Sequence, residues 1–303
     1  MTTAAKAVRE EKRTITMDVP TGAPADSGER FYLLTNPDHE PDTPVPLVLD
    51  LHGLAEGALV HTMMSAFSDL AEKEGFAVVF PNGTGSPVGW NVGIDATNSI
   101  DLAFISTMLD TLGQDLCIDE SRIYATGLSN GAMMSSALGC ALSERIAAIA
   151  PVAGVTKLDD CDPGRPVPVL AFHGTADDIL LFNGGVGSGL GRALGGAETS
   201  STTTTTLPAD LDGEGYPATV AAWAEHNGCE PDARDEDVSD EVIRRVYDCP
   251  EGGDVEFAII KGGGHTWPGS EFSKSIANIV GPTTFDIDAT GEIWAFFQRF
   301  RLP

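Results

Sequence analysis

Five short apolar segments, each ending in a turn that contains glycine or proline, constrain the fold of this chain more than any other feature. They read PLVLDLHG, FAVVFPNG, RIYATG, AAIAPVAG and VPVLAFHG, at residues 46–53, 76–83, 122–127, 147–154 and 167–174. Segments that are apolar on both faces are typical of parallel strands buried between two layers of helices. Helical patterns lie between them, at 64–74, 100–112 and 131–144. This alternation predicts an α/β chain with a mostly parallel, doubly wound sheet.

The end of the chain extends this pattern. The segments VIRRVYD and VEFAIIK predict two strands paired across Pro250–Asp254, and an apolar stripe from Ile293 to Phe300 predicts a closing helix. Residues 183–215 are rich in Gly, Ser and Thr and predict a long loop. We expect residues 1–29 to form an N-terminal extension with a first strand, and residues 30–303 to form one domain.

Charge excludes some classes of partner. The chain of 303 residues has 45 acidic and 18 basic side chains, a formal net charge of -27. Nucleic acids and anionic membranes require a basic surface, so neither is an expected partner. The first residues, MTTAAKAVREEKRTITMDV, are charged and do not form a signal peptide, and no segment is apolar for long enough to span a membrane. We expect a monomer that acts on a small-molecule or oligomeric substrate.

A serine between two glycines is the first candidate for chemistry. Gly127-Leu128-Ser129-Asn130-Gly131 stands where the strand RIYAT meets the helical pattern AMMSSALGCAL. Gly-x-Ser-x-Gly at such a junction forms a sharp turn that exposes the serine hydroxyl beside a helix N-terminus. A serine that only caps the helix is the alternative. We therefore predict Ser129 as a nucleophile.

A serine nucleophile needs a base and a carboxylate that orients the base, in the chain order Ser, Asp or Glu, His. Asp177 follows the strand VPVLAFHG and is the predicted acid, with its neighbour Asp178 as the rival. His265 follows the strand VEFAIIK in a glycine-rich loop and is the predicted base. His52 has a different predicted role, which is to fix a loop by hydrogen bonding.

Acyl transfer also requires donors for the developing oxyanion. The backbone N–H of Asn130, directly after the nucleophile, is one expected donor. The backbone N–H of Leu54, in the loop LHGLAEG after the first long strand, is the other. We expect no cofactor and no metal.

The five cysteines form no CxxC pair, so a zinc site is not expected. Cys229 and Cys249 flank an acidic, loop-rich segment and are predicted to form a disulfide. For Cys140 the sequence favours Cys161 as a partner, because both are expected at the edge of the sheet away from Ser129. Cys117 is expected at the same edge and competes for that pairing.

With these residues in place, the chain resembles the secreted α/β-hydrolases grouped as polyhydroxybutyrate depolymerase-like and feruloyl esterase-like. The stretches that carry the resemblance are PLVLDLHG, FAVVFPNGTGSPVGWN, RIYATGLSNGAMMSS, IAAIAPVAG, RPVPVLAFHGTADD and GGGHTWPG. The resemblance implies the α/β-hydrolase fold. The segment 183–215, expected as a long loop or lid-like insertion after the acid-bearing strand, departs from the family pattern in its length and composition. The resemblance also implies Ser129, Asp177 and His265 as the catalytic triad, and export from the cell although the sequence shows no signal peptide.

The residues predict a serine esterase. Together with the resemblance, they lead us to expect activity on feruloyl or other phenolic esters, or on oligomers of hydroxyalkanoate or aromatic polyesters. Trp267, two residues after His265, and Trp90 are expected at the mouth of the site, where either ring could stack on an aromatic acyl group. Packing at the rim is the alternative role for both. An acetylxylan esterase, a peptidase of the same fold and a non-catalytic binding protein are the alternative functions.

Overall fold

The computed structural model describes residues 10–18, 26–37, 43–92, 99–157, 162–195 and 208–303. Its ten strands are β1 (Glu11–Thr16), β2 (Glu29–Thr35), β3 (Val45–Leu51), β4 (Ala77–Pro81), β5 (Ile118–Leu128), β6 (Ala148–Val152), β7 (Val169–Gly174), β8 (Ala233–Asp237), β9 (Val242–Tyr247) and β10 (Val255–Ile260). They form one sheet in the order β1-β2-β4-β3-β5-β6-β7-β10-β9-β8. The six central strands from β4 to β10 are parallel, and the pairs at both edges are antiparallel. The predicted sheet is thus confirmed, including the pairing of β9 with β10.

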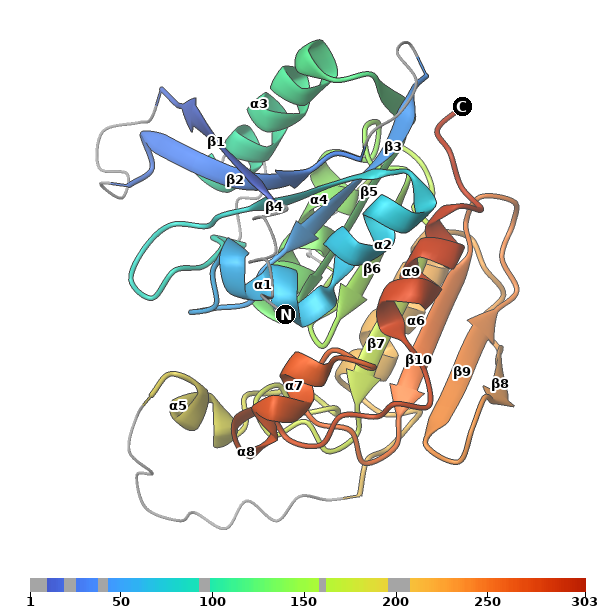
Figure 1. The fold of residues 1–303 in the computed structure, drawn as a ribbon. Coiled ribbons are helices and arrows are strands. Elements are labelled where there is room, and N and C mark those ends of the chain that lie inside the picture. The colour runs from blue at the N-terminus through green and yellow to red at the C-terminus, as the bar shows by residue number, and fades with distance from the viewer. Residues whose placement is uncertain (1–9, 19–25, 38–42, 93–98, 158–161, 196–207) are drawn as a thin grey trace, which may run out of the picture.

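Helices cover both faces of this sheet (Figure 1). They are α1 (Ala58–Ser65), α2 (Phe67–Glu74), α3 (Ile100–Asp115), α4 (Asn130–Ala141), α5 (Gly189–Ala193), α6 (Tyr216–His226), α7 (Glu271–Ser275), α8 (Ala277–Val280) and α9 (Ala289–Phe297). One apolar core lies between the sheet and α3, α4 and α6, and contains Trp223. A second core lies between the sheet and α1, α2 and α9, and contains Trp294. Two buried faces explain why the central strands are apolar on both sides.

Two helical segments differ from expectation. The pattern at 64–74 belongs to two helices, because Ala66 adopts φ 55° and separates α1 from α2. Alanine gives no sequence signal for this left-handed conformation, which L residues rarely adopt. The segment 183–215 contains the short helix α5 at Gly189–Ala193, and residues 196–207 of that segment lie outside the described part of the chain.

The predicted disulfide between Cys229 and Cys249 is confirmed, and it joins the chain after α6 to the chain after β9. Cys117 is a free, half-buried thiol. Cys161 lies outside the described residues, so its pairing with Cys140 stays a prediction. None of the helices in the described part of the chain combines the length and the apolarity needed to cross a membrane.

The carboxyl ends of the parallel strands meet at one edge of the sheet. In Figure 1 this is the lower edge, where α7 and α8 lie to the left of the lower ends of β7 and β10, and α5 lies farther left. Open α/β sheets bind their ligands at this edge, because it collects the loops that follow each strand. The residues predicted from the sequence as catalytic all follow strands that end there.

Candidate active site

Ser129 is the single residue between the end of β5 and the start of α4, and it has φ 57° and ψ -116°. A non-glycine residue with positive φ is strained, and such strain is common at functional turns. The surrounding backbone holds it, since the Ser129 N–H donates to the carbonyl of Val152 on β6 at 2.9 Å. A Cβ atom at Gly127 or Gly131 would clash with the carbonyl oxygen of Leu51 on β3. The two glycines of the motif therefore let β3 pass close to this turn.

Asp177 and His265 follow β7 and β10, which are parallel neighbours in the sheet. The Nδ1–H of His265 donates to Oδ2 of Asp177 at 2.7 Å. The other carboxylate oxygen, Oδ1, accepts the backbone N–H groups of Ile179 and Leu180, each at 2.9 Å. With the proton assigned to Nδ1, the Nε2 atom of His265 keeps a lone pair, which is the state a general base requires.

Asp178, the rival acid, has another partner. Its carboxylate accepts from Arg192 of α5 at 2.5 Å and is partly exposed. The side chain of Asp177 is buried and faces His265 instead. The two neighbouring carboxylates thus make separate contacts, and only Asp177 contacts the predicted base.

A second histidine contacts the same carboxylate and was not predicted as part of the site. Nε2 of His173 lies 3.2 Å from Oδ2 of Asp177 and 2.9 Å from the carbonyl oxygen of Leu180, and its ring stacks on Tyr216. Burial raises the pKa of Asp177, but the electrostatic interaction with His265 and the hydrogen bonds from His173 and His265 outweigh this effect, so the pKa lies well below its usual range. Asp177 is therefore ionised. The sequence signal was available, since His173 ends a strand four residues before Asp177.

Of the two predicted oxyanion donors, Asn130 directly follows Ser129, and Leu54 belongs to a loop that approaches Ser129. A Cβ atom at Gly53 would lie 3.7 Å from the Cβ of Ser129, which brings the peptide of Leu54 close to the nucleophile. Within the described part of the chain, neither the Leu54 nor the Asn130 backbone N–H donates a hydrogen bond to another residue. The side chain of Asn130 binds the backbone of Trp90, as Oδ1 accepts from its N–H at 2.6 Å and Nδ2 donates to its carbonyl at 3.1 Å.

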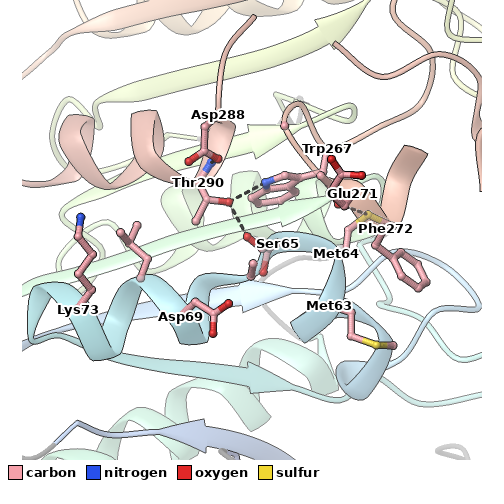
Figure 2. Close-up of a pocket in the computed structure, with 14 residues that line it drawn as sticks. Met63, Met64, Ser65, Asp69, Lys73, Trp267, Glu271, Phe272, Asp288 and Thr290 are labelled. Carbon is pink, nitrogen blue, oxygen red and sulfur yellow. Dashed lines mark hydrogen bonds between the residues drawn. The ribbon is translucent and has the colours of Figure 1, made fainter. Parts of the chain in front are cut away.

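The two tryptophans expected at the mouth of the site lie in the interior. Trp90 is 5% exposed, and its indole N–H donates to the carbonyl of His52 at 2.9 Å. Trp267 is 1% exposed, and its indole N–H donates to Oγ1 of Thr290 (Figure 2). Its ring meets that of His61 edge-on, with 5.7 Å between the ring centroids. These positions correct the expectation of an exposed aromatic wall, because both rings are already packed against protein. Sequence position alone could not show this, since the groups that enclose Trp267 come from distant helices.

A cavity of about 390 Å³ lies beside Trp267, between α1, α2, α7 and the start of α9. Figure 2 shows Met63, Met64 and Phe272 on one side of it and Asp69, Lys73 and Asp288 around it. None of Ser129, Asp177 and His265 lines this cavity. It is therefore separate from the predicted catalytic residues.

His52 fixes a loop, as predicted. Its Nδ1–H donates to the carbonyl of Gly53 at 2.7 Å, and its Nε2 accepts from the N–H of Gly83 at 2.8 Å. Burial lowers the pKa of His52 to about 4, so the ring is neutral, as this donor–acceptor pattern requires. The described residues also contain no group of three or more His, Cys, Asp or Glu side chains that could hold a metal ion.

Comparison with known proteins finds no family model that matches the chain. The chain is 30% identical over 231 residues to feruloyl esterase B of Piromyces equi, a match that covers 74% of this chain and 40% of that protein. It is 34% identical over 165 residues to feruloyl esterase C of Emericella nidulans, covering 52% of this chain and 58% of that protein. The matches thus span less than two thirds of the length of either relative.

Among solved structures, an acetyl xylan esterase from Aspergillus awamori matches 88% of this chain and 98% of its own length. The TM-score is 0.57 and the sequence identity is 15%. At this identity the likeness concerns the fold. The mixed sheet with helices on both faces is therefore the α/β-hydrolase fold.

Proposed function

The chain belongs to the feruloyl esterase-like α/β-hydrolases, and from this premise we propose that it is a serine esterase with Ser129, His265 and Asp177 as its catalytic triad. One observation carries the proposal. Ser129 occupies a positive-φ turn between strand and helix, while the neighbouring strands β7 and β10 bring Asp177 and His265 into a 2.7 Å hydrogen bond.

The proposed reaction begins with Ser129. Its Oγ attacks the ester carbonyl carbon while Nε2 of His265 takes the hydroxyl proton, and Asp177 stabilises the imidazolium that forms. The negative oxygen of the tetrahedral intermediate accepts hydrogen bonds from the N–H groups of Leu54 and Asn130. The carbon–oxygen bond to the alcohol then breaks, and the alcohol leaves with the proton from His265. A water molecule, deprotonated by His265, attacks the acyl-enzyme and releases the carboxylic acid.

For the substrate we propose feruloyl or related phenolic esters. The names of the matched relatives support this choice. Exposed apolar side chains also support an apolar acyl group: Leu54, which follows Gly53 in the loop that approaches Ser129, is 39% exposed, and Leu59 and Met63 are exposed on α1. Acetylated xylan is the second candidate, because a bifunctional acetylxylan esterase/xylanase of Neocallimastix patriciarum is 32% identical over 137 residues, 45% of this chain and 20% of that protein. Polyester oligomers are a further proposed substrate, and the same apolar surface supports them.

We propose an extracellular location for the enzyme. The disulfide between Cys229 and Cys249 supports it, since such bonds persist in oxidising compartments and are rare in the cytosol. Fractionation of the natural producer, followed by activity assays of cells and medium, tests this proposal.

A substrate panel tests the proposed activity. Methyl ferulate, acetylated xylan, hydroxybutyrate oligomers and terephthalate esters are each incubated with the purified chain and with Ser129→Ala. We expect hydrolysis of methyl ferulate to have the highest kcat/KM, and a fall in kcat of about 10³-fold or more in the variant, because nucleophile and base act as a unit. Retention of most activity by Ser129→Ala would remove this serine from the mechanism.

A further inference from the structure

A buried charged network lies beneath the loop that carries Leu54. His61 of α1 donates through Nε2–H to Oδ1 of Asp50 at 2.7 Å, and through Nδ1–H to Oε1 of Glu56 at 3.0 Å. Each carboxylate accepts one further hydrogen bond. Oδ2 of Asp50 accepts from the hydroxyl of Ser65 at 2.5 Å, and Oε2 of Glu56 accepts from the backbone N–H of Gly53 at 2.6 Å.

Both ring nitrogens of His61 face carboxylate oxygens, so the ring donates twice and is an imidazolium. Burial lowers the pKa of His61, but the charges of Asp50 and Glu56 raise it by more, so that the pKa lies at about 10. The side chains of His61 and Asp50 are fully buried, and that of Glu56 is nearly so. Stability alone does not explain this charged group, because a protein with well-packed apolar side chains of similar volume in its place is often equally stable.

The network ends at Gly53, whose carbonyl belongs to the same peptide as the Leu54 N–H. Glu56 holds the N–H of Gly53, while the carbonyl of Gly53 accepts from Nδ1 of His52 at 2.7 Å and from the backbone N–H of Glu56 at 3.3 Å. A trans peptide is planar, with C=O and N–H on opposite sides, so a fixed Gly53 carbonyl also fixes the direction of the Leu54 N–H. The next residue, Ala55, has φ 64°, a strained conformation that the loop must be held in.

We propose that Glu56, held by His61, is a positioning residue that sets the orientation of the Leu54 N–H for the oxyanion. This inference rests on the proposed function. Glu56 does not touch the reacting atoms; it binds the backbone one residue before the donor, and the charge of His61 keeps its carboxylate in place. Asp50 and Ser65 in turn anchor His61 to the end of β3 and the end of α1.

Two substitutions at Glu56 separate positioning from folding. In Glu56→Ala the Gly53 N–H loses its acceptor. In Glu56→Gln the carboxamide can accept from Gly53 through Oε1 and donate through Nε2 to a neutral His61, so every buried polar group keeps a partner. Neutral hydrogen bonds are roughly half as strong as charge-assisted ones, so the Gln variant holds the loop more weakly.

We expect kcat for p-nitrophenyl acetate to fall about 10- to 100-fold in Glu56→Ala, part of the loss expected for a missing oxyanion donor, with KM within twofold. Glu56→Gln should lie between that variant and the unmodified protein. Phenylboronic acid forms a tetrahedral adduct with a catalytic serine, so its inhibition constant should rise by a factor similar to the fall in kcat. A merely structural residue would not link these two quantities.

Glu256 gives the matched control. Glu256 lies on β10, outside the network, and its largely buried carboxylate pairs with Arg244 of β9 and with Arg299 after α9. Glu256→Ala and Glu256→Gln should therefore keep kcat within twofold. The proposal is overturned if folded Glu56→Ala keeps kcat within twofold, or if kcat falls without a change in boronate inhibition. Failure of Glu56→Gln to fold would assign the network to stability and also overturn it. If the unmodified protein does not hydrolyse the ester, the proposed function fails instead.

Discussion

Two adjacent carboxylates with different partners give the sharpest comparison between single residues. Asp177 accepts hydrogen bonds from His265 and two backbone N–H groups and lies 3.2 Å from Nε2 of His173, whereas Asp178 is bound to Arg192 at the surface. Asp177→Asn places an amide where the imidazole proton must be accepted, which favours the wrong tautomer of His265. We expect kcat to fall by about 10⁴-fold, as for the corresponding change in the best-studied serine triad.

Asp178→Asn is the control for this prediction, since it makes the same chemical change one residue away. Kinetics of p-nitrophenyl acetate hydrolysis measure both variants, and the second should stay within a few-fold of the unmodified protein. Equal losses in the two variants would show that Asp177 has no special role.

Trp267 leads to a second prediction at this scale. Its ring is packed against that of His61. Its indole N–H donates to Thr290, which also donates to the carbonyl of Ser65 at 2.5 Å (Figure 2). Trp267→Phe leaves the Thr290 hydroxyl without this donor and opens space, so we expect about 1–3 kcal/mol less free energy of unfolding. The kcat/KM values for methyl ferulate and for a butyrate ester should fall by the same factor. A larger fall in kcat/KM for methyl ferulate than for the butyrate ester would instead indicate that Trp267 contacts the acyl group.

At the scale of elements, the parallel strands were predictable because burial on both faces leaves an unmistakable apolar run. The junction of strand, Ser129 and helix could also be predicted, because the close approach of β3 allows no side chain at Gly127 or Gly131. The break at Ala66 was not readable, because alanine carries no signal for positive φ. The network around His61 was also hidden: Asp50, Glu56 and His61 lie within twelve residues of each other, but only the turn after β3 brings their side chains together.

The disulfide supports a prediction about the elements that it joins. Cys229–Cys249 connects the end of α6 to the end of β9, with a sequence separation of 20 residues. Replacing both cysteines by serine should lower the free energy of unfolding by about 3 kcal/mol, because the unfolded chain regains the freedom of that loop. Denaturant unfolding measures the loss, and kcat should not change, since the residues of the proposed triad follow other strands. Cys117→Ser, which alters a free thiol, should leave stability within experimental error, and an equal loss there would point to packing instead.

At the scale of the whole molecule, the pH dependence of stability follows from His61. Its pKa in the folded protein, about 10, exceeds the ordinary value of 6.5. The charged network therefore contributes its full stability below pH 6.5, and the contribution is lost as pH rises towards about 10. We expect the melting temperature to fall over this range. Glu56→Gln removes one of the two carboxylates that raise this pKa and should flatten the slope; an unchanged slope would show that His61 is not the group responsible.

The acidic surface sets the response of the molecule to salt. With 45 acidic and 18 basic side chains, most carboxylates have no cation to pair with, so repulsion among them opposes the compact state. Salt also weakens attractive pairs such as Arg245 with Asp235, but the excess of one sign makes repulsion the larger effect. The Debye length falls to about 10 Å at 0.1 M and about 3 Å at 1 M, so the melting temperature should rise steeply at low salt and then level off.

Calorimetric scans in NaCl and in KCl at equal ionic strength should agree, since screening depends on ionic strength alone. A linear rise without a plateau would indicate exclusion of salt from the surface, and a flat or falling curve would mean that repulsion among the carboxylates does not limit the stability of this fold.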